Sequence, residues 1–98
     1  MKTYYVYILK CSDGTYYTGI TSNLVNRMLE HQSGKHIDSY TYGRRPVLLM
    51  YYAEFTNVEL AIATEKQIKN WSKAKKDALI DNQFDELPNL ARKNFNKQ

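Results

Sequence analysis

The chain is short and moderately basic, with 98 residues, 43% hydrophobic and 24% charged content, and a formal net charge of +4 at pH 7. This length fits one domain and exceeds the roughly 40 residues below which disulfides or metals are usually needed for folding. The composition excludes disordered and collagen-like chains, and no apolar run has the roughly 18 residues of a membrane span. The single cysteine, Cys11, predicts a buried thiol in a reducing compartment. Since a strand-like segment follows Met1 without a signal sequence, we expect a cytoplasmic protein.

The first third of the chain predicts a β-hairpin followed by a helix. Residues 3–11 and 15–20 are rich in tyrosine and β-branched residues, and a Ser-Asp-Gly turn signal separates them. Thr21 and Ser22 are candidate N-caps for a helix whose apolar periodicity ends at Gly34.

The remainder predicts a loop, one more strand and two helices. Residues 35–46 show no apolar periodicity and are typical of a surface loop. Residues 47–55 form an apolar run that indicates a buried strand, central or well covered. Each helix that follows is preceded by a capping residue: Asn57 before 58–71 and Ser72 before 73–82.

This order, β-β-α-β-α-α, predicts an α+β protein with a small three-stranded antiparallel sheet flanked by helices. We expect one domain over residues 1–83. The segment 84–98 is then a tail that is either a short helix or disordered.

One acidic residue, Glu65, lies within the apolar stripe of the second predicted helix. Four apolar residues fall within about 60° of it on a helical wheel, namely Val58, Ala61, Ile62 and Ile68. A carboxylate in that position is costly unless it is paired or binds a metal ion. The alternative is an exposed ion pair between Glu65 and Lys69, four residues apart.

Arg27 and His31 are also four residues apart and share one side of the first predicted helix. Arginine binds phosphate oxygens through two donors, and histidine can carry a proton, so the pair suits a phosphate site. The alternative is that both are solvated surface residues. Tyrosine is frequent, with nine residues in the chain, and most of them are expected to pack in the sheet.

The joint pattern of these residues resembles the GIY-YIG nuclease family, and most closely its small stand-alone bacterial members of the UPF0213-like kind. Val6-Tyr7-Ile8 stands for the first motif and, ten residues on, Tyr17-Thr18-Gly19 stands for the second. Arg27, His31 and Glu65 follow in the family's order, and the resemblance covers residues 3–80. Val6 replaces a motif glycine and Thr18 a motif isoleucine. A late asparagine used in some branches matches neither Asn70 nor Asn82 securely.

The resemblance implies a site in which five residues converge on a phosphate and one metal ion: Tyr7, Tyr17, Arg27, His31 and Glu65. Glu65 would hold a single Mg²⁺ or Mn²⁺, and Arg27 would stabilise the charge of the transition state. We expect Tyr7 to act as the base after a neighbouring cation lowers its pKa, with His31 relaying the proton and Tyr17 positioning water or phosphate. Gly19 is expected to be structural.

The expected function is metal-dependent endonuclease cleavage of structured, nicked or single-stranded DNA in repair or recombination. Four basic residues are candidates for contacts with the nucleic-acid backbone: Arg44, Arg45, Lys69 and Lys73. RNA is an open alternative as substrate, and the protein is expected to be a monomer or a weak homodimer. Two other readings are a non-catalytic nucleic-acid binder that keeps this fold and a protein-interaction module that uses exposed tyrosines.

Overall fold

The computed structural model describes residues 2–86, and side chains as far as residue 82. Its elements are β1 (Tyr4–Lys10), β2 (Tyr16–Thr21), α1 (Leu24–Ser33), the short 3-10 helix η1 (Tyr42–Arg44), β3 (Leu48–Phe55), α2 (Val58–Lys69) and α3 (Lys73–Glu86). The predicted α+β order is confirmed. Helix α3 continues past the expected end at residue 82, and residues 87–98 of the predicted tail lie outside the described residues.

The three strands form one antiparallel sheet in the order β2-β1-β3. The central strand is β1, in which Val6, Tyr7, Ile8 and Leu9 are all fully buried. The expectation that residues 47–55 form a central or well-covered strand is wrong, because β3 is an edge strand in which Leu48 is 61% exposed. A continuous apolar run cannot by itself distinguish an edge strand from a central one.

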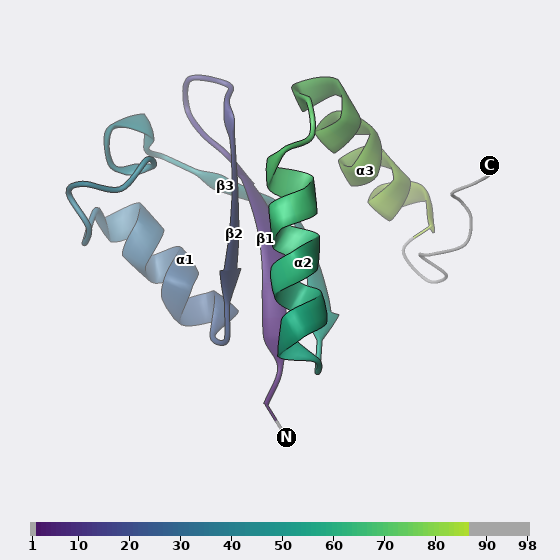
Figure 1. Ribbon diagram of the computed structural model, residues 1–98. Helices are drawn as coiled ribbons and strands as arrows, with labels where there is room; N and C mark the ends of the chain where they lie inside the picture. Colours follow the sequence, from purple (N-terminus) through teal and green to yellow (C-terminus); the bar gives the residue numbers. More distant parts are fainter. Residues whose placement is uncertain (1, 87–98) are drawn as a thin grey trace.

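Helices cover both faces of the sheet, with α1 on one side and α2 on the other (Figure 1). Alternate residues of β1 point to opposite faces. Tyr7 and Leu9 pack on the α1 side with Leu24 and Met28 of that helix. Val6 and Ile8 pack on the other side against α2 and α3, where the buried residues are Ala61, Ile68 and Ile80.

The helix termini follow most of the predicted capping signals. Asn57 caps α2 and Ser72 caps α3, and Gly34 ends α1 in the left-handed conformation, with φ of 71°. The N-cap of α1 is Asn23, whose side chain accepts a hydrogen bond from the backbone N–H of Asn26. Thr21, one of the two expected caps, instead hydrogen-bonds to the backbone of Asn23 and so supports the true cap.

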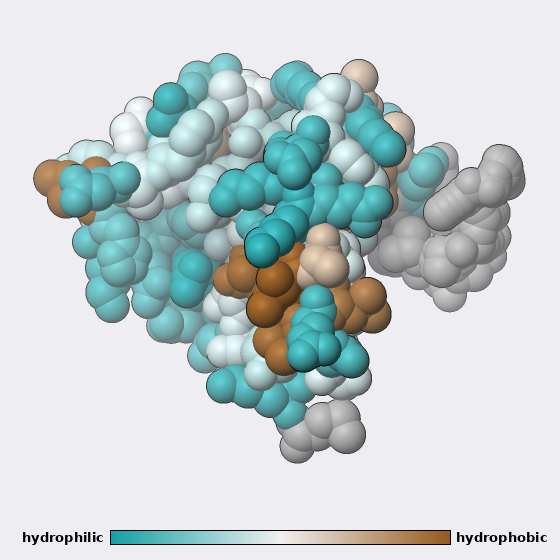
Figure 2. All heavy atoms as spheres, in the orientation of Figure 1, coloured by the Kyte–Doolittle hydropathy of each residue, from teal (hydrophilic) through white to brown (hydrophobic). Residues whose placement is uncertain are grey.

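The surface over α2 is divided between apolar and polar parts. Figure 2 shows an apolar patch over this helix, where Val58, Leu60 and Ile62 are partly exposed, beside hydrophilic side chains. Cys11 is buried, as predicted. Among the helices that the structure describes, none has both the length and the apolar content that a membrane span needs.

Candidate active site

Tyr7 is at the centre of the candidate site and is fully buried in β1. Its Oη is 3.0 Å from Nε2 of His31. Gly19 lies opposite Tyr7 in the sheet register, and the tyrosine ring crosses it so closely that an added Cβ would be 2.5 Å from Cζ of the ring. Gly19 is therefore structural, as expected, and its role is to leave room for Tyr7.

His31 connects Tyr7 to the loop that follows α1. Its Nδ1 is 2.8 Å from Oγ1 of Thr41, and that hydroxyl is 3.3 Å from Oγ of Ser39. His31 and Thr41 are both buried, so the reading of His31 as a solvated surface residue is wrong. Because each ring nitrogen has one partner, the imidazole can accept from Tyr7 while it donates to Thr41, or the reverse.

Tyr17 lies beside the hydrogen-bonded residues Tyr7 and His31, between them and the more exposed Tyr40. Its ring centre is 5.4 Å from that of His31 and 6.3 Å from that of Tyr7. On its other side it stacks on Tyr40 at 5.9 Å, and the guanidinium of Arg44 covers Tyr40 at 3.9 Å. The second motif tyrosine is thus fixed between a buried network and an exposed aromatic pair.

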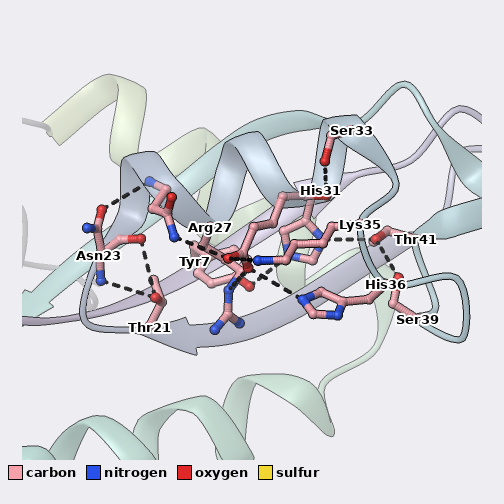
Figure 3. Close-up of polar contacts among 12 residues, drawn as sticks. Tyr7, Thr21, Asn23, Arg27, His31, Ser33, Lys35, His36, Ser39 and Thr41 are labelled. Atoms are coloured by element: carbon pink, nitrogen blue, oxygen red, sulfur yellow. Dashed lines mark hydrogen bonds and ion pairs between the residues drawn. The ribbon is translucent and has the colours of Figure 1, made fainter.

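Arg27 extends from α1 to the same place and is held by Glu30. The Arg27 Nε is 3.2 Å from Oε1 of Glu30, and Lys35 and His36 each approach the Glu30 carboxylate to 3.6 Å (Figure 3). Desolvation by burial acts to raise the pKa of the Glu30 carboxyl, but the nearby cations, Lys35 first among them, outweigh it and hold this pKa below its usual range. Glu30 therefore remains ionised near neutral pH and keeps the arginine beside Tyr7.

The protonation of the network differs from the expectation. Burial, followed by the neighbouring Tyr17, raises the pKa of Tyr7 to about 12, although Arg27 acts in the opposite direction. A lowered pKa for this tyrosine was expected, and desolvation outweighs the cation. Burial, followed by Arg27, also lowers the pKa of His31. At neutral pH the pair is thus a neutral phenol beside a neutral imidazole.

Glu65 is on α2, on the opposite side of the sheet from Tyr7. Ala61 and Ile68 are buried as expected, but Val58 and Ile62 are 39% and 41% exposed. Glu65 therefore lies at the edge of the buried stripe, not at its centre. Its side chain is only 13% exposed, and its Oε2 is 3.7 Å from Nζ of Lys69.

The structure brings Tyr7, Tyr17, Arg27 and His31 together, whereas Glu65 contacts none of them through a hydrogen bond or ion pair among residues 2–82. Strand β2 forms one edge of the sheet. A hollow of about 310 Å³ lies there, lined by Tyr16, Tyr17, Thr18, Tyr40, Lys69 and Lys76. The hollow is bordered by Tyr17 of the second motif and by Lys69, the ion-pair partner of Glu65.

A metal ion at Glu65 would have one carboxylate to bind. No group of three or more His, Cys, Asp or Glu residues is placed to hold a metal in the part of the chain that the structure describes. Mg²⁺ and Mn²⁺ commonly keep several waters beside one or two carboxylates. Glu65 therefore fits a hydrated cation, provided that Lys69 moves aside.

The four expected backbone-contact residues all have intramolecular contacts. Arg44 pairs with Asp13 at 3.0 Å, and Arg45 covers the ring of Tyr42 at 4.7 Å, so both arginines help to hold the loop. Lys69 pairs with Glu65, and the Nζ of Lys73 is 5.4 Å from the ring centre of Tyr16. Only the two lysines belong to the helices beside the hollow.

Several residues of the site were not predicted. Thr41 and Tyr40 lie in a segment without periodicity, so no sequence signal distinguishes them from other loop residues. Glu30 could have been found from its spacing, because it is three residues from Arg27 on one helix. Lys76 belongs to a run of lysines, and only the packing of α3 shows that it is buried.

Comparison with known proteins agrees with the motifs. Residues 3–77 match the family model of the GIY-YIG catalytic domain. A UPF0213 protein of Syntrophus aciditrophicus (strain SB) is 46% identical over 80 residues, which cover 82% of this chain and 92% of the relative. The UPF0213 protein NP_0776A of Natronomonas pharaonis is 43% identical over 77 residues, which cover 79% of this chain and 89% of the relative.

Two solved structures share the fold. The solution NMR structure of the UPF0213 protein BH0048 from Bacillus halodurans has a TM-score of 0.54 and 40% identity, covering 81% of this chain and 83% of that one. The solution NMR structure of EF2693 from E. faecalis has a TM-score of 0.59 and 32% identity, covering 86% and 90%. The chain therefore belongs to the GIY-YIG nuclease family and is similar to its small UPF0213 proteins.

Proposed function

We propose that this protein is a metal-dependent endonuclease that hydrolyses phosphodiester bonds of structured, nicked or single-stranded DNA, with a role in repair or recombination. The observation that carries the proposal is the buried chain from Tyr7 through His31 to Thr41, with Arg27 and Tyr17 beside it. A tyrosine hydrogen-bonded to a neutral imidazole can transfer a proton, and an arginine beside it can bind a phosphate.

The proton transfer requires both residues of the pair. With a pKa of about 12, only about one Tyr7 in 10⁵ is ionised at neutral pH, so our proposal does not rely on a pre-formed phenolate. In our proposal Thr41 holds the tautomer in which Nε2 of His31 accepts. Tyr7 then removes the proton of the attacking water while it passes its own proton to His31. Tyr17 positions the water or the phosphate.

Arg27 supplies the charge stabilisation on this side of the sheet. Tyr7 is fully covered in the free protein, so water reaches its hydroxyl only after a neighbouring group moves. Arg27 is 38% exposed and is held by Glu30, and a bound phosphate would compete for its guanidinium. We propose that this exchange both binds the phosphate and opens access to Tyr7.

Glu65 is the proposed ligand of one Mg²⁺ or Mn²⁺ ion. When bound, such a cation neutralises charge on the scissile phosphate and on the leaving oxygen. The carboxylate suits this role because it is largely covered and, among the described side chains, has a single loose ion pair, to Lys69. A phosphate that lies along the β2 edge would adjoin both Glu65 and the Tyr7 side.

The test compares the wild-type protein with Glu65→Gln on labelled single-stranded, duplex, nicked and branched DNA, with Mg²⁺, Mn²⁺ or EDTA. We expect cutting that requires metal and falls by at least about 10³-fold in the variant, because the glutamine cannot hold the cation. Glu59→Gln is the matched control, since Glu59 is an exposed acid on the same helix. Equal cutting by wild type and Glu65→Gln would contradict the proposal.

A second candidate function is non-catalytic nucleic-acid binding. It is favoured by the burial of Tyr7 and by the separation of Glu65 from the other motif residues. In that case none of the substrates is cut, and wild type and Glu65→Gln bind DNA with equal, salt-sensitive affinity.

A further inference from the structure

Lys76 is a largely covered lysine for which the described side chains provide no partner. It is in the first part of α3 and is 9% exposed, yet it forms no ion pair or hydrogen bond with any side chain among residues 2–82. Burial, followed by repulsion from the neighbouring cation Lys69, lowers the pKa of Lys76. The covered stem of Lys76 carries its ammonium to the hollow at the β2 edge, where the cation is available to a ligand.

Thr18 presents a second unsatisfied group in the same place. It is 3% exposed on β2, and its Oγ1 is the only fully buried side-chain polar atom without a hydrogen-bond partner in the described part of the chain. Buried hydroxyls nearly always have a partner. Thr18 and Lys76 both line the hollow of about 310 Å³ at the β2 edge.

These two groups together select an anion. An ammonium donates up to three hydrogen bonds and carries a positive charge, and a hydroxyl can donate one more. A ligand with several anionic oxygens satisfies both.

The remaining walls of the hollow are aromatic. Tyr17 and Tyr40 stack with an angle of 24° between their planes, and the Tyr16 hydroxyl donates to a carboxylate oxygen of Asp77, which fixes that ring in place. Aromatic rings bind the faces of bases and sugars without regard to sequence. The walls thus suit the organic part of a nucleotide, and the two polar groups suit its phosphate.

We propose that this hollow binds one nucleotide of the substrate strand next to the scissile phosphate, with Lys76 and Thr18 on its phosphate and Tyr17 and Tyr40 against its sugar or base. The assignment rests on the proposed function, since Tyr17 borders both the hollow and the candidate active site. A volume of about 310 Å³ gives room for one nucleotide. A single strand or an unpaired end, whose bases are free to reach the tyrosines, is the substrate we propose.

The experiment is a scan in which one phosphate at a time of a fluorescent single-stranded oligonucleotide is replaced by an uncharged methylphosphonate, with affinity measured by anisotropy in EDTA. For the wild type we expect one position, besides the scissile one, at which the replacement weakens binding about tenfold. Lys76→Met should bind the unmodified strand about tenfold more weakly and lose nothing further at that position.

Two more variants separate the pocket from general charge and from folding. Lys66→Met removes an exposed lysine of α2 and should keep the wild-type pattern at every position. Thr18→Val keeps the shape of the side chain and should weaken binding by about threefold. The thermal unfolding of each variant is measured alongside, and Lys76→Met should be about as stable as wild type because methionine keeps the apolar part of the covered side chain.

The proposal is overturned if Lys76→Met binds as tightly as wild type or remains sensitive at the same position. Because binding is measured without metal, this result is independent of catalysis. A wild type that cuts no DNA but shows the Lys76-dependent position would refute the nuclease and support the pocket. A wild type that cuts DNA but shows no such position would support the nuclease and refute the pocket.

Discussion

Buried polar groups on the α1 side of the sheet and at the β2 edge differ in whether they have hydrogen-bond partners. On the α1 side, Tyr7, His31 and Thr41 form a continuous chain of hydrogen bonds. At the hollow beside β2, the Thr18 hydroxyl is buried without a partner among the described side chains, and Lys76 lies beside it. The first region is completed by the protein itself, whereas in our proposal a ligand completes the second. Whether a buried polar group is satisfied thus separates a structural network from a binding site.

The largest expected effect comes from breaking the satisfied network at its centre. Tyr7→Phe removes the hydroxyl that passes a proton to His31, so we expect DNA cleavage to fall by about 10²–10⁴-fold. Binding in EDTA should change little, because the hydroxyl is buried and does not contact the phosphate in the free protein. Single-turnover cutting and anisotropy measure the two quantities separately.

Tyr52→Phe is the control for this change. Tyr52 lies opposite Tyr7 in the register of β1 and β3, but it is partly exposed and contacts Tyr5 instead of His31. It should cut at the wild-type rate. If Tyr7→Phe also cut at the wild-type rate, the relay would be wrong and Tyr17 would become the candidate base.

The next effect tests how tightly the same network is packed. Gly19→Ala would place a methyl group against the ring of Tyr7, 2.5 Å from Cζ. We expect the free energy of unfolding to fall by about 3 kcal/mol, because a buried ring on the central strand cannot move aside freely. Gly43→Ala is the control, since an added Cβ there meets nothing within 4 Å. Urea unfolding that gave the two variants equal stability would show that Tyr7 has room to shift.

The comparison between the two regions is tested most directly by one substitution made on both sides. Thr41→Val leaves Nδ1 of the buried His31 without its partner and should lower the free energy of unfolding by about 1–2 kcal/mol. Thr18→Val removes a hydroxyl that has no partner and should leave the stability unchanged or raise it by up to about 1 kcal/mol. Both are measured by urea unfolding. Equal losses at the two positions would remove the distinction on which the pocket assignment rests.

The sequence predicted the residues of the network better than their environment. The resemblance to the GIY-YIG motifs implied a common site for Tyr7, Tyr17, Arg27 and His31, and the structure places these four side chains together. The pKa of Tyr7 could not be predicted, because it depends on burial in the central strand and not on the motif. The same holds for Thr41, whose contact with His31 is made by a loop without a pattern.

The α2 side was less predictable because helical periodicity does not show how far a neighbouring strand extends. The wheel placed Glu65 at the centre of a stripe, whereas only Ala61 and Ile68 of that stripe are buried. Lys76 resembled the other lysines around it, and the packing of α3 against the β2 edge is what buries it. Tertiary contacts of this kind have no local signal in a sequence.

The smallest expected effect is the pH dependence that the buried histidine gives to stability. Burial lowers the pKa of His31 in the folded protein below its ordinary value of about 6.5. As pH falls through about 6.5, the unfolded chain gains a proton at this residue while the folded chain does not, so the free energy of unfolding decreases. It stops decreasing below the folded-state pKa, and above about pH 7 the residue contributes no such loss.

Urea unfolding between about pH 5 and 7.5 measures this slope, and the range stays above the region where carboxylates titrate. His31→Gln removes the titrating ring and should flatten the curve. Because protonation of His31 in the folded protein blocks acceptance from Tyr7, cutting by the wild type should fall only below the lowered pKa of this residue, at a pH under about 6.5. A stability curve that His31→Gln left unchanged would show that the pKa of His31 is the same in the folded and unfolded protein, and the neutral acceptor of the relay would then lose its support.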